Sequence, residues 1–219
     1  QVGMPVKGAG IPVGATIASI DGPTSITLSA IPTATAVGVA VSFFDPAGVG
    51  FARPSGRLAI DPGVVVKLQG ARIELERGTS QLIAEGTAGK PVIFTSLGDN
   101  RFGAGGTFLT HANLPDARAA GDWGGIVVNA GAKASIDYAY LAYGGGQTPI
   151  EGGFDQFNVV EVHQGDLRVA HSRIENNAAG TASSNRGGRG TNVAATIFAR
   201  GAQPVILGND FRDNLGAIV

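Results

Sequence analysis

From residue 57 onward, the chain alternates between short apolar runs and clusters of turn residues. Within several runs apolar and polar residues alternate, so one face of each expected strand is buried. Gly, Asn, Asp and Pro separate the runs, and no window has the apolar spacing and cap of an amphipathic helix. The pattern predicts an all-β protein with strands within 64–68, 71–76, 81–85, 91–96, 125–128, 135–143, 158–163, 167–175, 194–199 and 204–211.

Two of these runs share a recurring pattern. Each combines apolar alternation with a polar pair and then an Asn-containing turn that ends in Gly, and residues 135–146 are a weaker copy. A repeat of about 20 to 40 residues with several strands is typical of a β-solenoid, in which like residues stack from coil to coil. Stacked Asn side chains are then expected to hydrogen-bond in ladders. The Asn residues in comparable places are Asn176, Asn177, Asn209 and Asn214. The alternative fold, a β-sandwich, predicts hairpin turns instead of this recurrence.

Three motifs resemble those of the right-handed parallel β-helix repeat proteins of bacterial surfaces, which share the pectin-lyase-like superfold. They are "PGVVVK" at 62–67, "GTAGKPVIFTS" at 86–96 and "DWGGI" at 122–126. The resemblance covers roughly residues 55–219 and implies a right-handed parallel β-helix. It implies no single activity, because that fold carries lyases, hydrolases, tailspikes, adhesins and inert stalks.

The first 47 residues have a different texture, rich in Gly, Thr, Ala and Val. They resemble small β modules that recur in phage tail proteins and large secreted bacterial proteins. We expect residues 1–47 to form a separate small β module or an N-terminal cap, 48–56 to be a linker, and 57–219 to be the β-helix. Both ends of the chain are abrupt, so we expect the helix to continue beyond residue 219 in a longer parent protein.

Composition excludes several classes of partner. The formal net charge is −1, with 16 basic and 17 acidic residues spread along the chain, so neither nucleic acid nor an anionic membrane is an expected partner. No apolar run has the length needed to cross a bilayer. There is no cysteine, which excludes disulfides, thiolate metal sites and cysteine nucleophiles.

A polysaccharide-cleaving enzyme on this fold needs carboxylates, with or without a basic residue, projecting from neighbouring coils on one outer face. The candidates for such a site are Asp137, Glu161, Asp166 and Arg173. Isolated outward carboxylates also keep a solenoid soluble, and no paired aspartates stand out, so catalysis is not the favoured interpretation. His163 and His171 bind a metal together only if their strands stack in register; capping histidines are the simpler interpretation.

Trp123, the only tryptophan, stands among glycines at the end of the long loop 97–121. It is either a platform for a sugar ring or, as we favour, a structural side chain that plugs the end of a coil. The same loop carries oxygen ligands suited to calcium, at spacings that match no known calcium motif. These calcium candidates are Asp99, Asp116 and Asp122. A second polar loop, 181–192, carries Arg186 and Arg189 as candidates for an anion or sugar contact.

These observations favour a non-enzymatic extracellular or cell-surface scaffold of bacterial type: a stalk, a filament or an adhesive segment of a larger secreted protein. We expect no cofactor, with calcium as the one candidate ion. The expected partners are another copy, stacked end to end, or a surface polysaccharide. Two alternatives stay open: a polysaccharide lyase or glycoside hydrolase that acts in a groove on the β-helix, and a carbohydrate-binding or tailspike-like receptor module.

Overall fold

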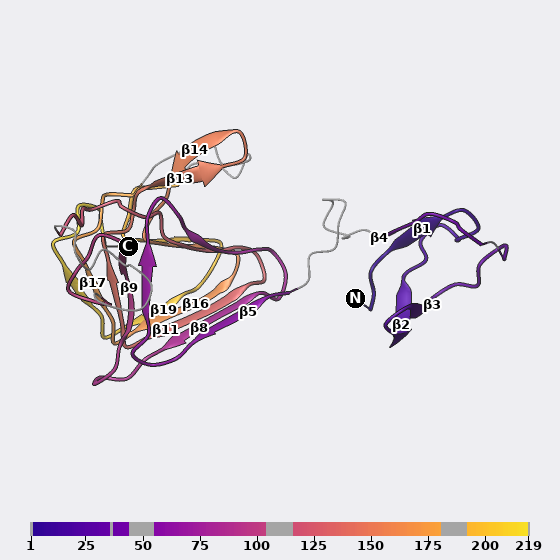
Figure 1. The fold of residues 1–219 in the computed structure, drawn as a ribbon, viewed down its shortest axis with the longest axis horizontal. Helices are drawn as coiled ribbons and strands as arrows, with labels where there is room; N and C mark the ends of the chain where they lie inside the picture. The colour runs from indigo at the N-terminus through magenta and orange to yellow at the C-terminus, as the bar shows by residue number, and fades with distance from the viewer. Residues whose placement is uncertain (1, 36, 44–54, 104–115, 181–191, 219) are drawn as a thin grey trace. The chain divides into compact units, whose positions relative to one another are not determined.

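A computed structural model describes residues 2–35, 37–43, 55–103, 116–180 and 192–218. The described residues form strands and turns without a helix, which confirms the predicted all-β class (Figure 1). None of them belongs to a helix that could cross a membrane. The chain divides into two compact units, Gln1–Pro54 and Ser55–Val219.

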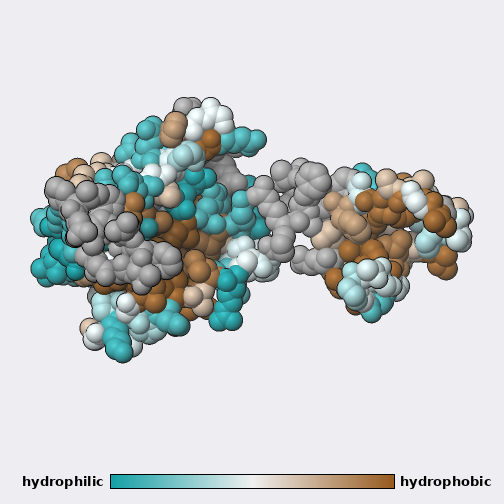
Figure 2. Space-filling view, in the orientation of Figure 1, coloured by the Kyte–Doolittle hydropathy of each residue, from teal (hydrophilic) through white to brown (hydrophobic). Residues whose placement is uncertain are grey.

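The first unit contains two antiparallel strand pairs. Strand β1 (Val6–Gly8) pairs with β4 (Val41–Phe43), and β2 (Ile17–Gly22) forms a hairpin with β3 (Ser25–Leu28). Among the described residues of this unit, the buried apolar side chains are Val6, Ala15 and Ile17. Many others are exposed, and brown hydrophobic residues cover much of the visible face of this unit (Figure 2).

The second unit is built from three parallel sheets. Sheet 1 contains β7 (Ile73–Leu75), β10 (Ile126–Val128), β15 (Val160–His163) and β18 (Ile197–Arg200). Sheet 2 contains β5 (Arg57–Ile60), β8 (Gln81–Glu85), β11 (Lys133–Asp137), β16 (Asp166–Ala170) and β19 (Val205–Leu207). Sheet 3 contains β6 (Val65–Leu68), β9 (Val92–Ser96), β12 (Ala139–Ala142), β17 (Arg173–Glu175) and β20 (Asp210–Arg212).

The chain visits these sheets in a fixed rotation, sheet 2, then sheet 3, then sheet 1. Each circuit adds one strand to each sheet, in parallel and in register with the strand before it. In Figure 1 the strands of sheet 2 lie side by side, from β5 in purple to β19 in yellow. Parallel sheets of stacked strands, instead of the hairpins of a sandwich, therefore form the second unit. One antiparallel hairpin, β13 (Gln147–Ile150) with β14 (Gly153–Gln156), projects from the third circuit and was not predicted.

The inward columns of the three sheets form a single core. Leu141 of β12 lies between Phe94 and Ile174 on the neighbouring strands, and all three are fully buried. The same in-register stacking of apolar residues occurs in sheets 1 and 2. Because alternate residues of a strand point to opposite faces, the residues between these columns form the outer surface.

Three predicted strands are each two strands with a corner between them. The runs 135–143, 167–175 and 204–211 turn at Tyr138, His171 and Gly208, which have φ angles of 44°, 46° and 64°. Tyrosine and histidine carry no turn signal in a sequence, because they adopt the left-handed region only when their surroundings hold them there. The corner N–H groups donate to the next circuit, Tyr138 to Ala170 O and His171 to Leu207 O, which holds these angles in place.

Candidate functional site

A network of charged and aromatic side chains covers the outer face of sheet 3, and its centre is Asp99. The Asp99 side chain has no exposed surface. It accepts hydrogen bonds from Thr95 Oγ1 at 2.6 Å and from Arg101 Nε and Nη2 at 3.0 and 2.9 Å. Burial alone raises the pKa of this carboxyl, but the hydrogen bonds from Arg101 and Thr95 outweigh burial and lower the pKa to about 2.

Arg101 connects Asp99 to two tyrosines of the third circuit. Its Nη2 donates to Tyr140 Oη at 2.9 Å and to Tyr143 Oη at 3.0 Å, and its guanidinium carbon lies 5.3 Å from the centre of the Phe102 ring. The hydrogen bonds to Asp99 raise the pKa of Arg101. Burial, and then the hydrogen bond that Tyr140 donates to Glu175, raise the pKa of Tyr140. Both groups are therefore held in their protonated forms, so neither serves as a base near neutral pH.

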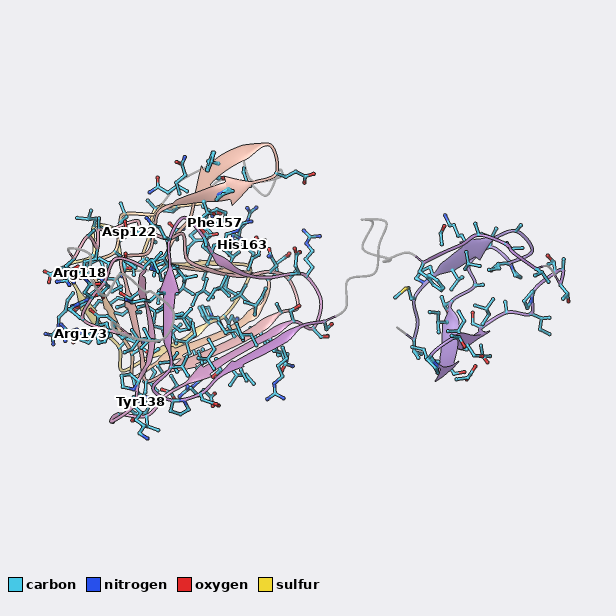
Figure 3. The ribbon with its side chains drawn as sticks, viewed as in Figure 1. Arg118, Asp122, Tyr138, Phe157, His163 and Arg173 are labelled. Atoms are coloured by element: carbon cyan, nitrogen blue, oxygen red, sulfur yellow. The ribbon has the colours of Figure 1, made fainter. Side chains whose placement is uncertain are left out.

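The carboxylates at the edge of this network are also occupied. Glu175 is bound by Tyr140 and by Arg173 of its own strand. Arg118 lies 3.4 Å from Asp99 and also pairs with Asp116. In Figure 3, Arg118 and Arg173 lie on one side of the second unit. The network ties residues 97–103 to the sheet, and its acids are satisfied by internal partners.

A groove of about 420 Å³ runs across the outer face of sheet 2. Polar side chains from successive strands line it, with the apolar residues Ile83 and Val205 between them. Hydrogen-bonding groups interspersed with apolar atoms are the chemistry that holds a sugar chain. The polar residues of the groove are Gln81, Lys133, Ser135, Asp166, Arg168 and Gln203.

A buried acid and a histidine lie on the outer face of sheet 1. Glu161 is fully buried and accepts hydrogen bonds from Asn158 N at 2.8 Å and Asn192 Nδ2 at 3.1 Å. Its Oε2 also lies 3.1 Å from His163 Nε2, which fixes the orientation of the imidazole ring. The Phe198 ring packs against His163 with the ring centres 5.6 Å apart. Figure 3 shows His163 and Phe157 on the side of the unit near the β13–β14 hairpin.

The structure does not bring the four catalytic candidates together. Glu161 belongs to sheet 1 and Arg173 to sheet 3. Asp137 and Asp166 share sheet 2 but lie at opposite ends of their strands, since Lys133 pairs in register with Asp166 and Asp137 with Ala170. Each of the three acids has a basic neighbour: Lys133 lies 3.0 Å from Asp166, Arg168 lies 2.8 Å from Asp137, and His163 lies beside Glu161. Arg173 pairs with the acid Glu175.

Trp123 lies in the core of the second unit. Its side chain has no exposed surface, and its Nε1 donates to Ala142 O at 2.8 Å. The indole packs against Gly144, where an added Cβ would lie 3.1 Å from the ring. A ligand could reach this indole only if the core opened.

The three calcium candidates already have internal partners. Asp99 and Asp116 bind arginines, while Asp122 accepts hydrogen bonds from Ser96 Oγ at 2.5 Å and Ala119 N at 2.8 Å. A guanidinium beside a carboxylate occupies the place that a cation would take. Among the described residues no group of three or more acidic, histidine or cysteine side chains is arranged to hold a metal ion.

The two histidines considered as a metal pair are separated by a corner of the fold. His163 ends a strand of sheet 1, whereas His171 forms the corner between sheets 2 and 3 and lies 2.9 Å from Asp137, so the two histidines do not stack. Tyr138, at one corner in Figure 3, stacks on His171 with ring centres 5.0 Å apart. Arg186 and Arg189 lie outside the described residues.

Sequence reasoning missed Arg101 and the role of His163. Arg101 follows Asp99 by two residues in a segment without strand periodicity, and its partner Tyr140 lies 39 residues further along the chain. The signal that could have found this contact is the position of the corners within the predicted strands. With those corners recognised, Tyr140 pairs in register with Ile93, on the strand that directly precedes Asp99 and Arg101.

Comparison of the chain with protein-family models, curated proteins and solved structures finds no match.

Proposed function

We propose that the second unit is a segment of a right-handed parallel β-helix that acts as a non-enzymatic scaffold on a bacterial surface or in a secreted protein. The observation that carries this proposal is the pairing of charges along the outer wall. On β17 and β20, and at the start of β7, an arginine binds an acid two residues away: Arg173 with Glu175, Arg212 with Asp210, and Arg72 with Glu74. Such pairs neutralise the charges of the wall and leave no free acid for catalysis at these positions.

The stacked turns support the same proposal. Asn177 Nδ2 donates to Asn214 Oδ1 at 2.8 Å, and both amides also donate to carbonyl groups of the previous circuit. Ladders of this kind satisfy the backbone of each corner and join successive circuits. The right-handed sense follows the general preference of parallel strand crossovers.

The groove of sheet 2 supports a second candidate function, the binding of a surface polysaccharide. An adhesive scaffold and a glycan-binding module differ in whether this groove has a ligand. Arg168 lines the groove and lies 2.8 Å from Asp137. It is the best single residue with which to test the candidate.

One experiment separates these functions from the enzymatic alternative. The chain is incubated with a panel of acidic and neutral polysaccharides, and both bound glycan and new reducing or unsaturated ends are measured. We expect no cleavage products. If a glycan binds, and Arg168→Ala weakens that binding at least tenfold while Arg212→Ala on sheet 3 does not, the groove is the glycan-binding site. Cleavage that scales with the concentration of the chain would overturn the scaffold proposal.

A further inference from the structure

A pocket of about 300 Å³ lies at the corner where the chain passes from sheet 1 to sheet 2. Successive circuits each contribute to it at the same corner. Ala130 and Gly201 present almost no side chain there, so a hollow forms between the longer residues. The residues that line the pocket are Arg77, Ala130, His163, Gln164, Arg200 and Gly201.

The described lining of this pocket is positively charged and contains no carboxylate. Arg77 and Arg200 are exposed, and neither has an acidic partner within the described part of the chain. Most other described arginines are paired, so two unpaired guanidinium groups at one hollow are exceptional on this wall. The paired arginines are Arg72, Arg101, Arg118, Arg168, Arg173 and Arg212.

His163 adds an oriented hydrogen-bonding group. Its Nε2 lies 3.1 Å from Glu161 Oε2, so Nδ1 is the ring nitrogen that remains for a further hydrogen bond. That Nδ1 atom is buried and has no hydrogen-bond partner among the described residues. A buried polar atom without a partner is uncommon in a folded protein and indicates a place where a ligand group can bond. When the imidazole carries both protons, Nδ1 donates.

We propose that this corner pocket binds an oxyanion: a carboxylate, sulfate or phosphate group. The guanidinium groups of Arg77 and Arg200 approach it from the first and last of the four strands of sheet 1, about 14 Å apart at three strand spacings. Two long arginine side chains span that distance and offer forked donors suited to planar and tetrahedral oxyanions. His163 Nδ1 and the Gln164 carboxamide complete the donor set. This site does not depend on the proposed scaffold function.

The test is isothermal titration of the full chain at low salt with three probes: inorganic sulfate, inorganic phosphate and a galacturonate oligomer. We expect one saturable site per chain. Arg77→Gln and Arg200→Gln each weaken binding at least tenfold, and His163→Asn weakens it by a similar factor. The matched control Arg212→Gln removes the same charge from sheet 3 and leaves the affinity within twofold.

The probes distinguish the source of the oxyanion. Tighter binding of the oligomer than of the inorganic ions supports the pocket as a site for an acidic glycan, and the reverse order supports it as a site for a free anion. Loss of affinity in Arg212→Gln equal to that in Arg77→Gln would show a diffuse charge effect and overturn the proposal. So would wild-type affinity in both Arg77→Gln and Arg200→Gln with circular dichroism unchanged.

Discussion

Asp99 illustrates how a buried charge is stabilised in this wall. A carboxylate without solvent contact is destabilised by several kcal/mol unless its oxygens are hydrogen-bonded and its charge is paired. Thr95 and Arg101 bind both oxygens, and Arg101 in turn is held by Tyr140 and Tyr143. The consequence is a carboxyl with a pKa of about 2 that stays ionised through the neutral range.

This shift makes the stability of the second unit depend on pH in the acid range. Because the pKa of Asp99 is lower in the folded state than its usual 3.8, the unfolded state binds more protons between these values. The stabilisation, about 2 kcal/mol, is present above pH 4 and is lost as the pH falls through about 2. In urea unfolding between pH 2 and pH 6, we expect Asp99→Asn to lower the free energy of unfolding at pH 6. We also expect it to flatten the acid limb, which is the fall of this free energy as the pH decreases.

The matched control is Asp166→Asn, which changes an exposed carboxylate that lies 3.0 Å from Lys133. Exposed pairs contribute little, so its acid limb should follow that of the unsubstituted chain. The charged groups that contact Asp99 are Arg101 and Arg118. A steep acid limb retained in Asp99→Asn would show that other carboxyls control the acid response.

Single residues also mark the limit of what the sequence predicts. Trp123, which we expected to be a structural side chain, is fully buried, and a large apolar side chain gains most by burial. Glu161 was placed on an outer face by strand alternation, and it does lie there. Alternation says nothing of what covers an outer face, so neither the full burial of Glu161 nor its contact with His163 could be predicted.

At the scale of elements, the corners and their ladders determine the architecture. Most strand positions in the second unit were predictable, but the corners at Tyr138, His171 and Gly208 were not, and two strands merged into one in each case. The predicted Asn ladder is confirmed for Asn177 and Asn214, which the pattern had placed in comparable positions. Recurring spacing is thus a stronger signal here than local propensity.

The ladder makes a specific prediction about Asn177. Its Oδ1 accepts from Gly144 N at 2.7 Å, and its Nδ2 donates to Leu141 O at 3.2 Å and to Asn214 Oδ1. Asn177→Ala leaves these buried groups unsatisfied, so we expect the free energy of unfolding to fall by about 2 to 3 kcal/mol in urea titrations.

The variant Asn177→Asp separates hydrogen bonding from size. Its carboxylate still accepts the hydrogen bond from Gly144 N. It cannot donate to Leu141 O or Asn214 Oδ1, so these two oxygens lie against a group that only accepts. We therefore expect Asp to destabilise the unit at least as much as Ala near neutral pH. A stability loss below about 0.5 kcal/mol for both variants would mean that the ladder is not a structural element of the stack.

At the scale of the whole molecule, the chain of the second unit passes through the three sheets in rotation. The outward residues of each strand therefore lie directly beside those of the next strand in the same sheet and form columns. This explains why residues far apart in sequence line one groove, such as Gln81, Ser135 and Arg168 on sheet 2. The repeat period predicted stacked strands, and the three parallel sheets confirm that much. The groove and the corner pocket depend on which side chains are short at each column, such as Ala130 and Gly201, and periodicity carries no such information.

The second unit is an in-register stack of circuits, and because the chain contains no cysteine, introduced cysteine pairs test this stack directly. Ser135→Cys with Arg168→Cys places two cysteines on neighbouring strands in register, with their Cα atoms about 4.8 Å apart, within the range of a disulfide. Ile83→Cys with Arg168→Cys places them two strands apart, about 9.6 Å, beyond that range. Under mild oxidation the first pair should form the intramolecular disulfide and the second should not; equal or reversed oxidation of the two pairs would contradict the stacked architecture and the scaffold proposed from it.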